Sequence, residues 1–101
     1  LESEIAVDDM RSIAINLREK VKSGVVVLST ISGGKPLLVA AVSPEAIKLG
    51  IKAGDLIKIG STTLGGGGGG KDDFAQGGGI DASAITKALK EITLLIEGKV
   101  N

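Results

Sequence analysis

The stretch LGGGGGGKDDFAQGGG, Leu64–Gly79, decides how this chain folds, because nine of its sixteen glycines lie there. Glycine loses more backbone freedom on folding than any other residue. A segment so rich in glycine is therefore either a flexible linker or a place where the backbone must come close to another group. Phe74, the only aromatic residue of the chain, interrupts the glycines, and a linker has no use for it.

Two ordinary interpretations of this segment are a phosphate-binding loop and a linker. Gly65–Lys71 satisfies most of the pattern G-x-x-x-x-G-K-[ST], but the last position is Asp72, where a hydroxyl should bind magnesium. Such a loop should also follow a strand and open a helix. Composition alone supports the flexible linker.

A third interpretation is a backbone cradle. Consecutive glycine amides can line a concave surface that accepts anions, and no Cβ blocks the approach of a ligand. Lys71 would add a positive charge, and Gln76 would add a donor and an acceptor. The partner of such a cradle would be a phosphate or a sugar.

The composition predicts a single domain with an aliphatic core. The chain has 101 residues, 43% of them hydrophobic, and no cysteine or histidine. Twelve basic and twelve acidic residues give zero net charge, so a nucleic-acid partner must be met by a local patch. The lack of cysteine fits an intracellular protein. Because the chain begins at Leu1, we expect it to be a fragment of a longer protein.

Periodicity and turn residues predict most of the elements. Apolar residues at helical spacing indicate a first helix, and two β-rich runs around Gly33-Gly34 indicate an antiparallel hairpin with strands covered on both faces. Ser43 and Pro44 are typical of a helix start. The predicted elements are a helix at Asp8–Lys22, strands in Gly24–Ser32 and Lys35–Ser43, a short helix ending at Gly50, and a helix that Asp81 caps and Gly98 ends.

The segment from Lys52 to Leu64 stays ambiguous on periodicity alone, since it fits either a helix starting near Asp55 or a strand at Leu56–Ile59. Ser43–Gly60 also looks like the PDZ pattern S-P-A-x-x-A-G-L-K-x-G-D-x-I, which would imply peptide binding by strand addition. A helix in this segment would exclude that alternative.

Two blocks of sequence carry a more specific resemblance. KAGDLIK at Lys52–Lys58, followed by the glycine block and by DFAQGGG at Asp73–Gly79, resembles the C-terminal domain of alanyl-tRNA synthetase, a DHH-associated (DHHA1-type) domain. The family usually has arginine where this chain has Lys71 and proline where it has Asp72. Lysine keeps the charge but loses the bidentate fork of arginine.

The resemblance implies an α/β fold, with a mixed β-sheet and packed helices in one small domain at residues 1–101, and a helix at Ala53–Leu64. It also implies a non-catalytic domain of a longer synthetase chain. That domain helps position tRNA, mostly at its elbow, for aminoacylation and editing in the cytoplasm. The other partners implied are the rest of the synthetase and a second copy, through upstream helices. The full-length enzyme would use ATP, Mg and Zn, and we expect no cofactor in this domain and no membrane association.

The predicted tRNA-binding residues combine the cradle with nearby charges. They are Lys71, Gly66, Gly67, Gly68, Gly69, Gly70 and Gln76, with Lys52 and Lys58 as helpers. Lys48 could join the lysines in a basic face, although lysines on amphipathic helices are usually only solvated. The competing function is that of a protein-interaction or spacing module, with tRNA held elsewhere in the enzyme.

Several residues have a structural explanation beside a functional one. We expect Phe74 to belong to the core rather than to stack on a base. Asp72, Asp73 and Asp81 fit a loop end and a helix cap better than a magnesium site. Gly77–Gly79 fits either a binding groove or a tight turn before the last helix. Without His or Cys, we expect no catalysis by this chain.

Overall fold

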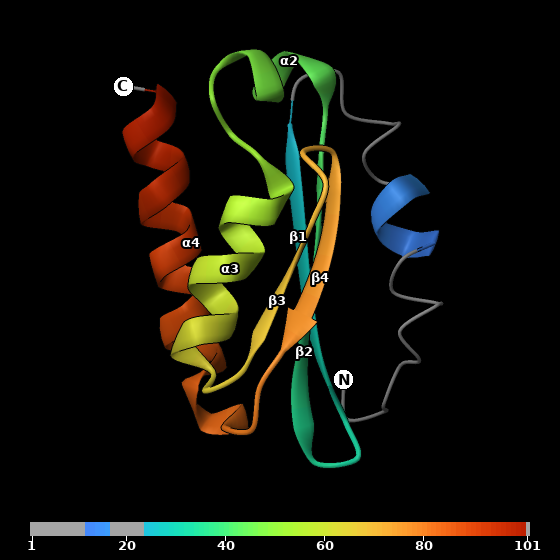
Figure 1. Cartoon of the computed structure of the whole chain (residues 1–101), viewed down its shortest axis with the longest axis vertical. Helices are drawn as coiled ribbons and strands as arrows, with labels where there is room; N and C mark the ends of the chain where they lie inside the picture. The colour runs from blue at the N-terminus through green and yellow to red at the C-terminus, as the bar shows by residue number, and fades with distance from the viewer. Residues whose placement is uncertain (1–11, 17–23, 101) are drawn as a thin grey trace.

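The computed structural model describes residues 12–16 and 24–100 of the chain. Residues 12–16 are helical, which agrees with the central part of the predicted helix at Asp8–Lys22, and the remainder of that prediction lies outside the described residues. The elements that follow, shown in Figure 1, are β1 (Val25–Ser32), β2 (Lys35–Val42), α2 (Pro44–Lys48), α3 (Ala53–Thr63), β3 (Gly67–Gly70), β4 (Phe74–Gly78), the 3-10 turn η1 (Ala82–Ala84) and α4 (Ile85–Val100).

The four strands form one sheet in the order β1-β2-β4-β3, with every pairing antiparallel. The predicted α/β class, a sheet with packed helices in one small domain, is therefore confirmed. The prediction of a mixed sheet is wrong. Tight turns connect β1 to β2 and β3 to β4, and such short turns can join only antiparallel neighbours.

The hairpin predicted around Gly33-Gly34 is confirmed. Gly33 and Gly34 have φ angles of 59° and 80°, the left-handed values that a two-residue hairpin turn requires at both central positions. Pairing runs from Ser32 opposite Lys35 to Val25 opposite Val42. This turn places the two apolar runs side by side over eight residues each.

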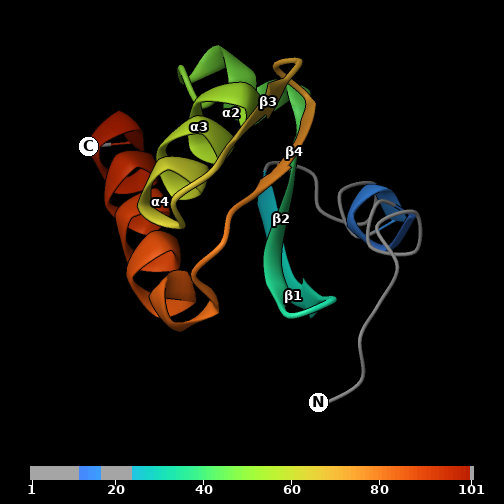
Figure 2. The same cartoon turned by 60° about the horizontal axis from the view of Figure 1, so that its bottom comes forward.

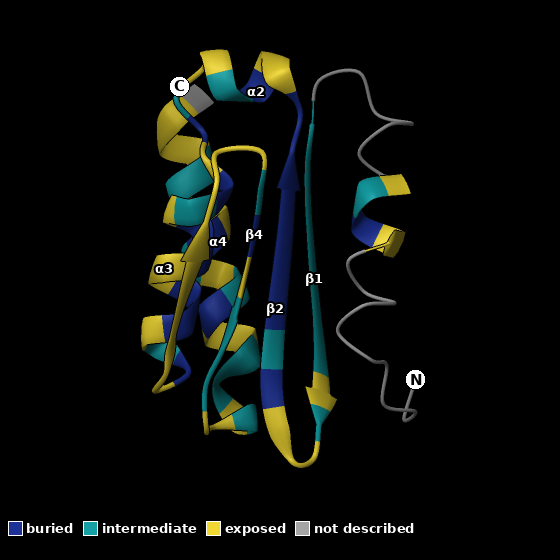
Figure 3. Ribbon diagram, turned by 45° about the vertical axis from the view of Figure 1, so that its right-hand side comes forward, coloured by how far each residue is buried: buried dark blue, intermediate teal, exposed yellow. Residues whose placement is uncertain are grey.

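The main core lies between the sheet and the layer formed by α3 and α4 (Figures 1 and 2). Strand β2 is buried along most of its length, as Figure 3 shows. Gly60 lets α3 lie close to both of its neighbours, because a Cβ there would stand 2.7 Å from Leu38 Cδ1 and 2.8 Å from Ile92 Cδ1. The buried residues of this core include Leu38, Ala40, Val42, Leu56, Ile57, Leu64, Ala88 and Ile92.

The opposite face of the sheet carries a smaller apolar cluster. Val39 and Ala41 of β2 are buried there together with Ala14, and Phe74 packs against them. Figure 2 shows the helical residues 12–16 on this side of the sheet, away from α3 and α4. Strand β2 is thus covered on both faces, as its continuous apolar sequence predicts.

Side-chain caps explain where α2 and η1 begin, whereas α3 begins without one. Ser43 caps α2 by accepting a hydrogen bond from the Ala46 amide, and the Asp81 carboxylate caps η1 by accepting one from the Ser83 amide. The prediction that Gly98 ends the last helix is wrong, since α4 continues to Val100. Glycine lowers helix propensity by about 1 kcal/mol but does not forbid the helical backbone.

Helix α3 resolves the ambiguous segment. Residues Ala53–Thr63 are helical, as the family resemblance implies, so Asp55–Ile59 is not a strand and the PDZ alternative is excluded. Within the part of the chain that the structure describes, no helix combines the length and apolar character needed to cross a membrane.

Candidate functional site

The glycine segment forms a strand rather than an open loop. Gly67–Gly70 is β3, and it pairs with β4 along its whole length. The Gly66 amide donates to the Ser61 carbonyl at 2.9 Å, and the Lys71 amide donates to the Phe74 carbonyl at 2.9 Å. The glycine run predicted to form a cradle is therefore a strand at the edge of the sheet, and the amides at its two ends are bonded inside the domain. The flexible linker and the phosphate loop are excluded, because the segment follows a helix and extends the sheet.

The two faces of β3 differ in what surrounds them. A Cβ at Gly66 would stand 2.2 Å from the Gly78 carbonyl oxygen, and one at Gly68 would stand 2.4 Å from the Gly77 Cα. At Gly67 and Gly69 a Cβ would meet nothing within 4 Å. Packing thus requires glycine on the inner face only, while the outer face of the strand stays bare.

The glycines that end β4 are explained by packing inside the domain. A Cβ at Gly77 would stand 2.4 Å from Ser61 Oγ, and one at Gly79 would stand 2.3 Å from the Leu64 carbonyl oxygen. The contacts explain Gly77 and Gly79 by a close approach of this segment to α3, which is a structural reason other than the tight turn expected from the sequence. Ser61 Oγ is fully buried in this contact and has no hydrogen-bond partner.

The turn between β3 and β4 is fastened to the start of α3. The Ala53 amide donates to the Asp72 carbonyl at 2.8 Å, and the Gly54 amide donates to the Lys71 carbonyl at 3.1 Å. Lys52, the N-cap residue of α3, therefore lies at the same end of the molecule as Lys71, and both residues are exposed. The first amides of α3 are occupied by these carbonyls, so the helix N-terminus is not free to bind an anion.

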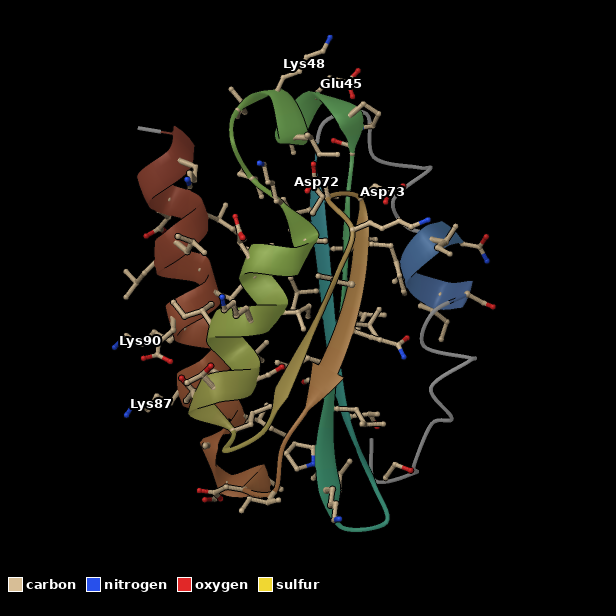
Figure 4. All side chains as sticks on the ribbon, viewed as in Figure 1. Glu45, Lys48, Asp72, Asp73, Lys87 and Lys90 are labelled. Carbon is tan, nitrogen blue, oxygen red and sulfur yellow. The ribbon has the colours of Figure 1, made fainter. Side chains whose placement is uncertain are left out.

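Charges of both signs meet at this end, which we call the tip. Figure 4 shows Lys48 and Glu45 of α2 above Asp72 and Asp73 of the β3–β4 turn. The lysines that lie here are thus interleaved with carboxylates. The arrangement is a mixed patch rather than the basic face considered from the sequence.

Gln76 lies on the outer face of the sheet. Its neighbours in β4, Ala75 and Gly77, face α3, and alternation along the strand turns Gln76 the other way. In the sheet it stands between Val39 of β2 and Gly69 of β3, and it is exposed.

Two hollows flank Gln76 on this face. The larger, the tip hollow, has a volume of about 360 Å³. Its lining comes from the helical residues 12–16 and from both sides of the β3–β4 turn: Ile15, Gly69, Gly70, Lys71, Asp73, Phe74, Ala75 and Gln76. The smaller, of about 150 Å³, includes Gly67 and Val39. The sequence predicted Lys71, Gln76 and the glycines as site residues but not Ile15 and Asp73. The one feature of the sequence that could have indicated this hollow is the isolated aromatic residue, Phe74.

Lys58 lies apart from the other predicted site residues. It lines a hollow of about 340 Å³ with Asp55 of α3 and Glu91 of α4, on the helical side of the sheet. Thr63 of α3 donates a hydrogen bond to the Glu91 carboxylate there. The structure therefore groups Lys71, Gln76, Gly69 and Gly70 around one hollow, with Lys52 at the same end of the molecule, and it leaves Lys58 and Gly67 outside that group.

The acidic residues form no metal-binding cluster in the described part of the chain. No group of three or more His, Cys, Asp or Glu residues is placed to hold an ion among residues 12–16 and 24–100. Asp81, one of the three carboxylates considered from the sequence, accepts hydrogen bonds from Ser83 as a helix cap. The described residues therefore offer no group of ligands that fits Mg or Zn.

Comparison with known proteins identifies the class to which this fold and glycine hairpin belong. The model of the DHHA1 domain family matches residues 1–98, and the chain belongs to that family. The fold of this chain is similar to that in the crystal structure of the C-Ala domain from Aquifex aeolicus alanyl-tRNA synthetase. The TM-score is 0.80 at 36% sequence identity, over 93% of this chain and 81% of that one.

The curated relatives that match this chain are alanine–tRNA ligases, which agrees with the structural comparison. The chain is 48% identical over 89 residues to an alanine–tRNA ligase of Herpetosiphon aurantiacus, which covers 88% of this chain and 10% of the relative. It is 46% identical over 83 residues to that of Acidothermus cellulolyticus, over 81% of this chain and 9% of the relative. The chain thus spans about a tenth of the length of these relatives. The resemblance to the C-terminal domain of alanyl-tRNA synthetase is confirmed.

Proposed function

We propose that this domain binds tRNA as a non-catalytic part of an alanyl-tRNA synthetase. It positions tRNA(Ala), by contacts at the elbow, so that one tRNA can serve both aminoacylation and editing. The observation that carries the proposal is the likeness to the C-Ala domain over 93% of the chain. Phosphate and sugar contacts that fix orientation without reading sequence suit this role.

The tip supplies the contacts. Lys71 and Lys52 are exposed at the same end of the molecule, where they reach phosphate groups, and Gln76 and Gly69 line the hollow beside Lys71. Lys58 is on the other side of the sheet, so it contributes at most a separate, weaker contact. The amides of Gly66 and Lys71 are used inside the domain, so they take no part in binding.

The rest of the enzyme supplies the chemistry. Without histidine or cysteine, this chain lacks the commonest acid–base and nucleophilic side chains. We assign ATP, Mg and Zn to other parts of a cytoplasmic synthetase. We assign dimerisation to helices upstream of this domain.

A gel-shift titration of the chain with a tRNA(Ala) transcript at two salt concentrations tests the proposal. We expect binding that weakens as salt rises, because lysine–phosphate contacts release counterions. Lys71→Glu should weaken binding about tenfold or more, since it removes one such contact and adds a repulsion.

The matched control is Lys90→Glu. It makes the same charge change on an exposed residue of α4, away from the tip (Figure 4). It should bind tRNA within about twofold of the original chain. If the original chain shows no affinity for tRNA at low salt, the proposal fails, and the domain is better explained as an interaction or spacing module.

A further inference from the structure

The tip hollow combines features that suit a flat, neutral ligand. Its volume of about 360 Å³ falls within the range of about 300–1,000 Å³ that holds small molecules. The half-buried ring of Phe74 and the side chain of Ile15 give it an apolar part. The amide of Gln76 offers both a donor and an acceptor at the rim. These are the groups that receive an unstacked nucleobase: an aromatic face and a side chain that can bond its edge.

The charges of the lining argue for a base rather than a phosphate inside the hollow. Lys71 brings one ammonium and Asp73 one carboxylate, so the lining has no net charge. The Lys71 amide is already bonded to Phe74, and the first amides of α3 are occupied by the carbonyls of the turn. A buried phosphate would therefore find one cation, one opposing anion and few donors.

The outer face of β3 carries no side chain at Gly69, which leaves room for a flat ring to enter the tip hollow. A Cβ at Gly69 would meet nothing within 4 Å, and its φ angle lies outside the left-handed region. Neither packing nor backbone conformation therefore requires glycine at this position. Gly69 also lines the hollow, so a side chain there would take up part of its space.

We propose that the tip hollow receives one unstacked nucleobase of the bound tRNA, held against Phe74 and hydrogen-bonded at its edge by Gln76, while Lys71 meets the adjoining phosphate. This inference rests on the proposed tRNA binding and adds the kind of contact made. It assigns Phe74 a second role beside its packing against Val39 and Ala41.

The decisive variant is Gly69→Val, with Gly67→Val as its matched control. Both residues lie on the outer face of β3 with nothing near their missing Cβ, but only Gly69 lines the tip hollow. Both variants should keep the circular dichroism spectrum and thermal midpoint of the original chain. Gly69→Val should bind the tRNA(Ala) transcript about tenfold more weakly, and Gly67→Val should bind within about threefold of the original.

Gln76→Ala separates base recognition from charge. It should weaken tRNA binding several-fold without changing the slope of log K against log salt, because no lysine–phosphate contact is lost. A changed slope would overturn the assignment of Gln76 to a base edge.

Chemical probing reads the inserted base directly. Dimethyl sulfate modifies exposed base edges, and we expect one loop base of the tRNA to be protected by the original chain and by Gly67→Val but not by Gly69→Val. If the original chain binds tRNA and no base is protected, or if the two valine variants weaken binding equally, the base pocket is wrong while tRNA binding stands. If the original chain does not bind at all, the proposed function itself has failed.

Discussion

At the scale of single residues, the glycines at positions 66–69 divide into two kinds. Gly66 and Gly68 are fixed by neighbouring backbone atoms closer than 3 Å to any added Cβ. Gly67 and Gly69 have open space in the same place. Four of the six consecutive glycines therefore alternate with a period of two residues, which is the period of a β-strand.

This alternation gives a sharp prediction for stability. Gly68→Ala should lower the free energy of unfolding by about 2 kcal/mol or more, because its Cβ would collide with the Gly77 backbone, which cannot move without disturbing the sheet. Gly69→Ala should leave that free energy within about 0.5 kcal/mol, or raise it slightly by restricting the unfolded chain. Urea denaturation of both variants measures the difference. Equal effects would show that β3 does not pair as described.

At the scale of elements, Ser43 joins the end of β2, which it follows directly, to the start of β1 and to the start of α2. Its hydroxyl oxygen accepts hydrogen bonds from the Gly24 amide at 2.9 Å and from the Ala46 amide at 3.3 Å. The Ser43 amide also donates to the Gly24 carbonyl at 3.0 Å. One buried serine thus holds the start of β1 against the start of α2, and the helix start is fixed relative to the sheet.

Ser43→Ala should lower the free energy of unfolding by about 2 kcal/mol, since it removes a helix cap and leaves the Gly24 and Ala46 amides without their acceptor. Thr93→Ala is the matched control. The Thr93 hydroxyl donates to the Leu89 carbonyl on the exposed surface of α4, where water can replace it. That variant should change the free energy by less than about 0.5 kcal/mol. A cost for Ser43→Ala as small as that of the control would contradict the bridging role.

At the scale of the whole molecule, the zero net charge limits how strongly the proposed tRNA binding can depend on electrostatic attraction. Twelve basic and twelve acidic residues give no long-range attraction, so the proposed binding rests on the few lysines at the tip. The slope of log K against log salt for tRNA should therefore be small, about −1 to −3. Lys52→Ala combined with Lys71→Ala should reduce its magnitude by about one to two. Fluorescence anisotropy over a salt series gives these slopes, and a slope much steeper than −3 would place the main contact elsewhere on the chain.

Local signals in the sequence were enough to predict the hairpin, the start of α2 and the helix α4, but not the end of α4 or the conformation of α3. The paired glycines at Gly33-Gly34, the Ser43-Pro44 helix start and the apolar stripe of α4 each act within a few residues, so their outcome can be inferred without the rest of the fold. The specific motif of Lys52–Lys58 and Asp73–Gly79 was enough to identify the family.

Only the tertiary structure decided what the glycines do. A glycine run has no side chains and therefore no pattern from which a strand, a loop or a linker could be told apart. Its conformation is imposed by what lies beside it, the backbone of β4 and the helix α3. The same holds for the candidate site: Ile15 and Gln76 are distant in sequence but line one hollow. Lys52 lies at the same end of the molecule as Lys71 because the β3–β4 turn is hydrogen-bonded to the start of α3. Contacts between distant segments depend on the packed sheet and helices, and no local run of residues specifies them.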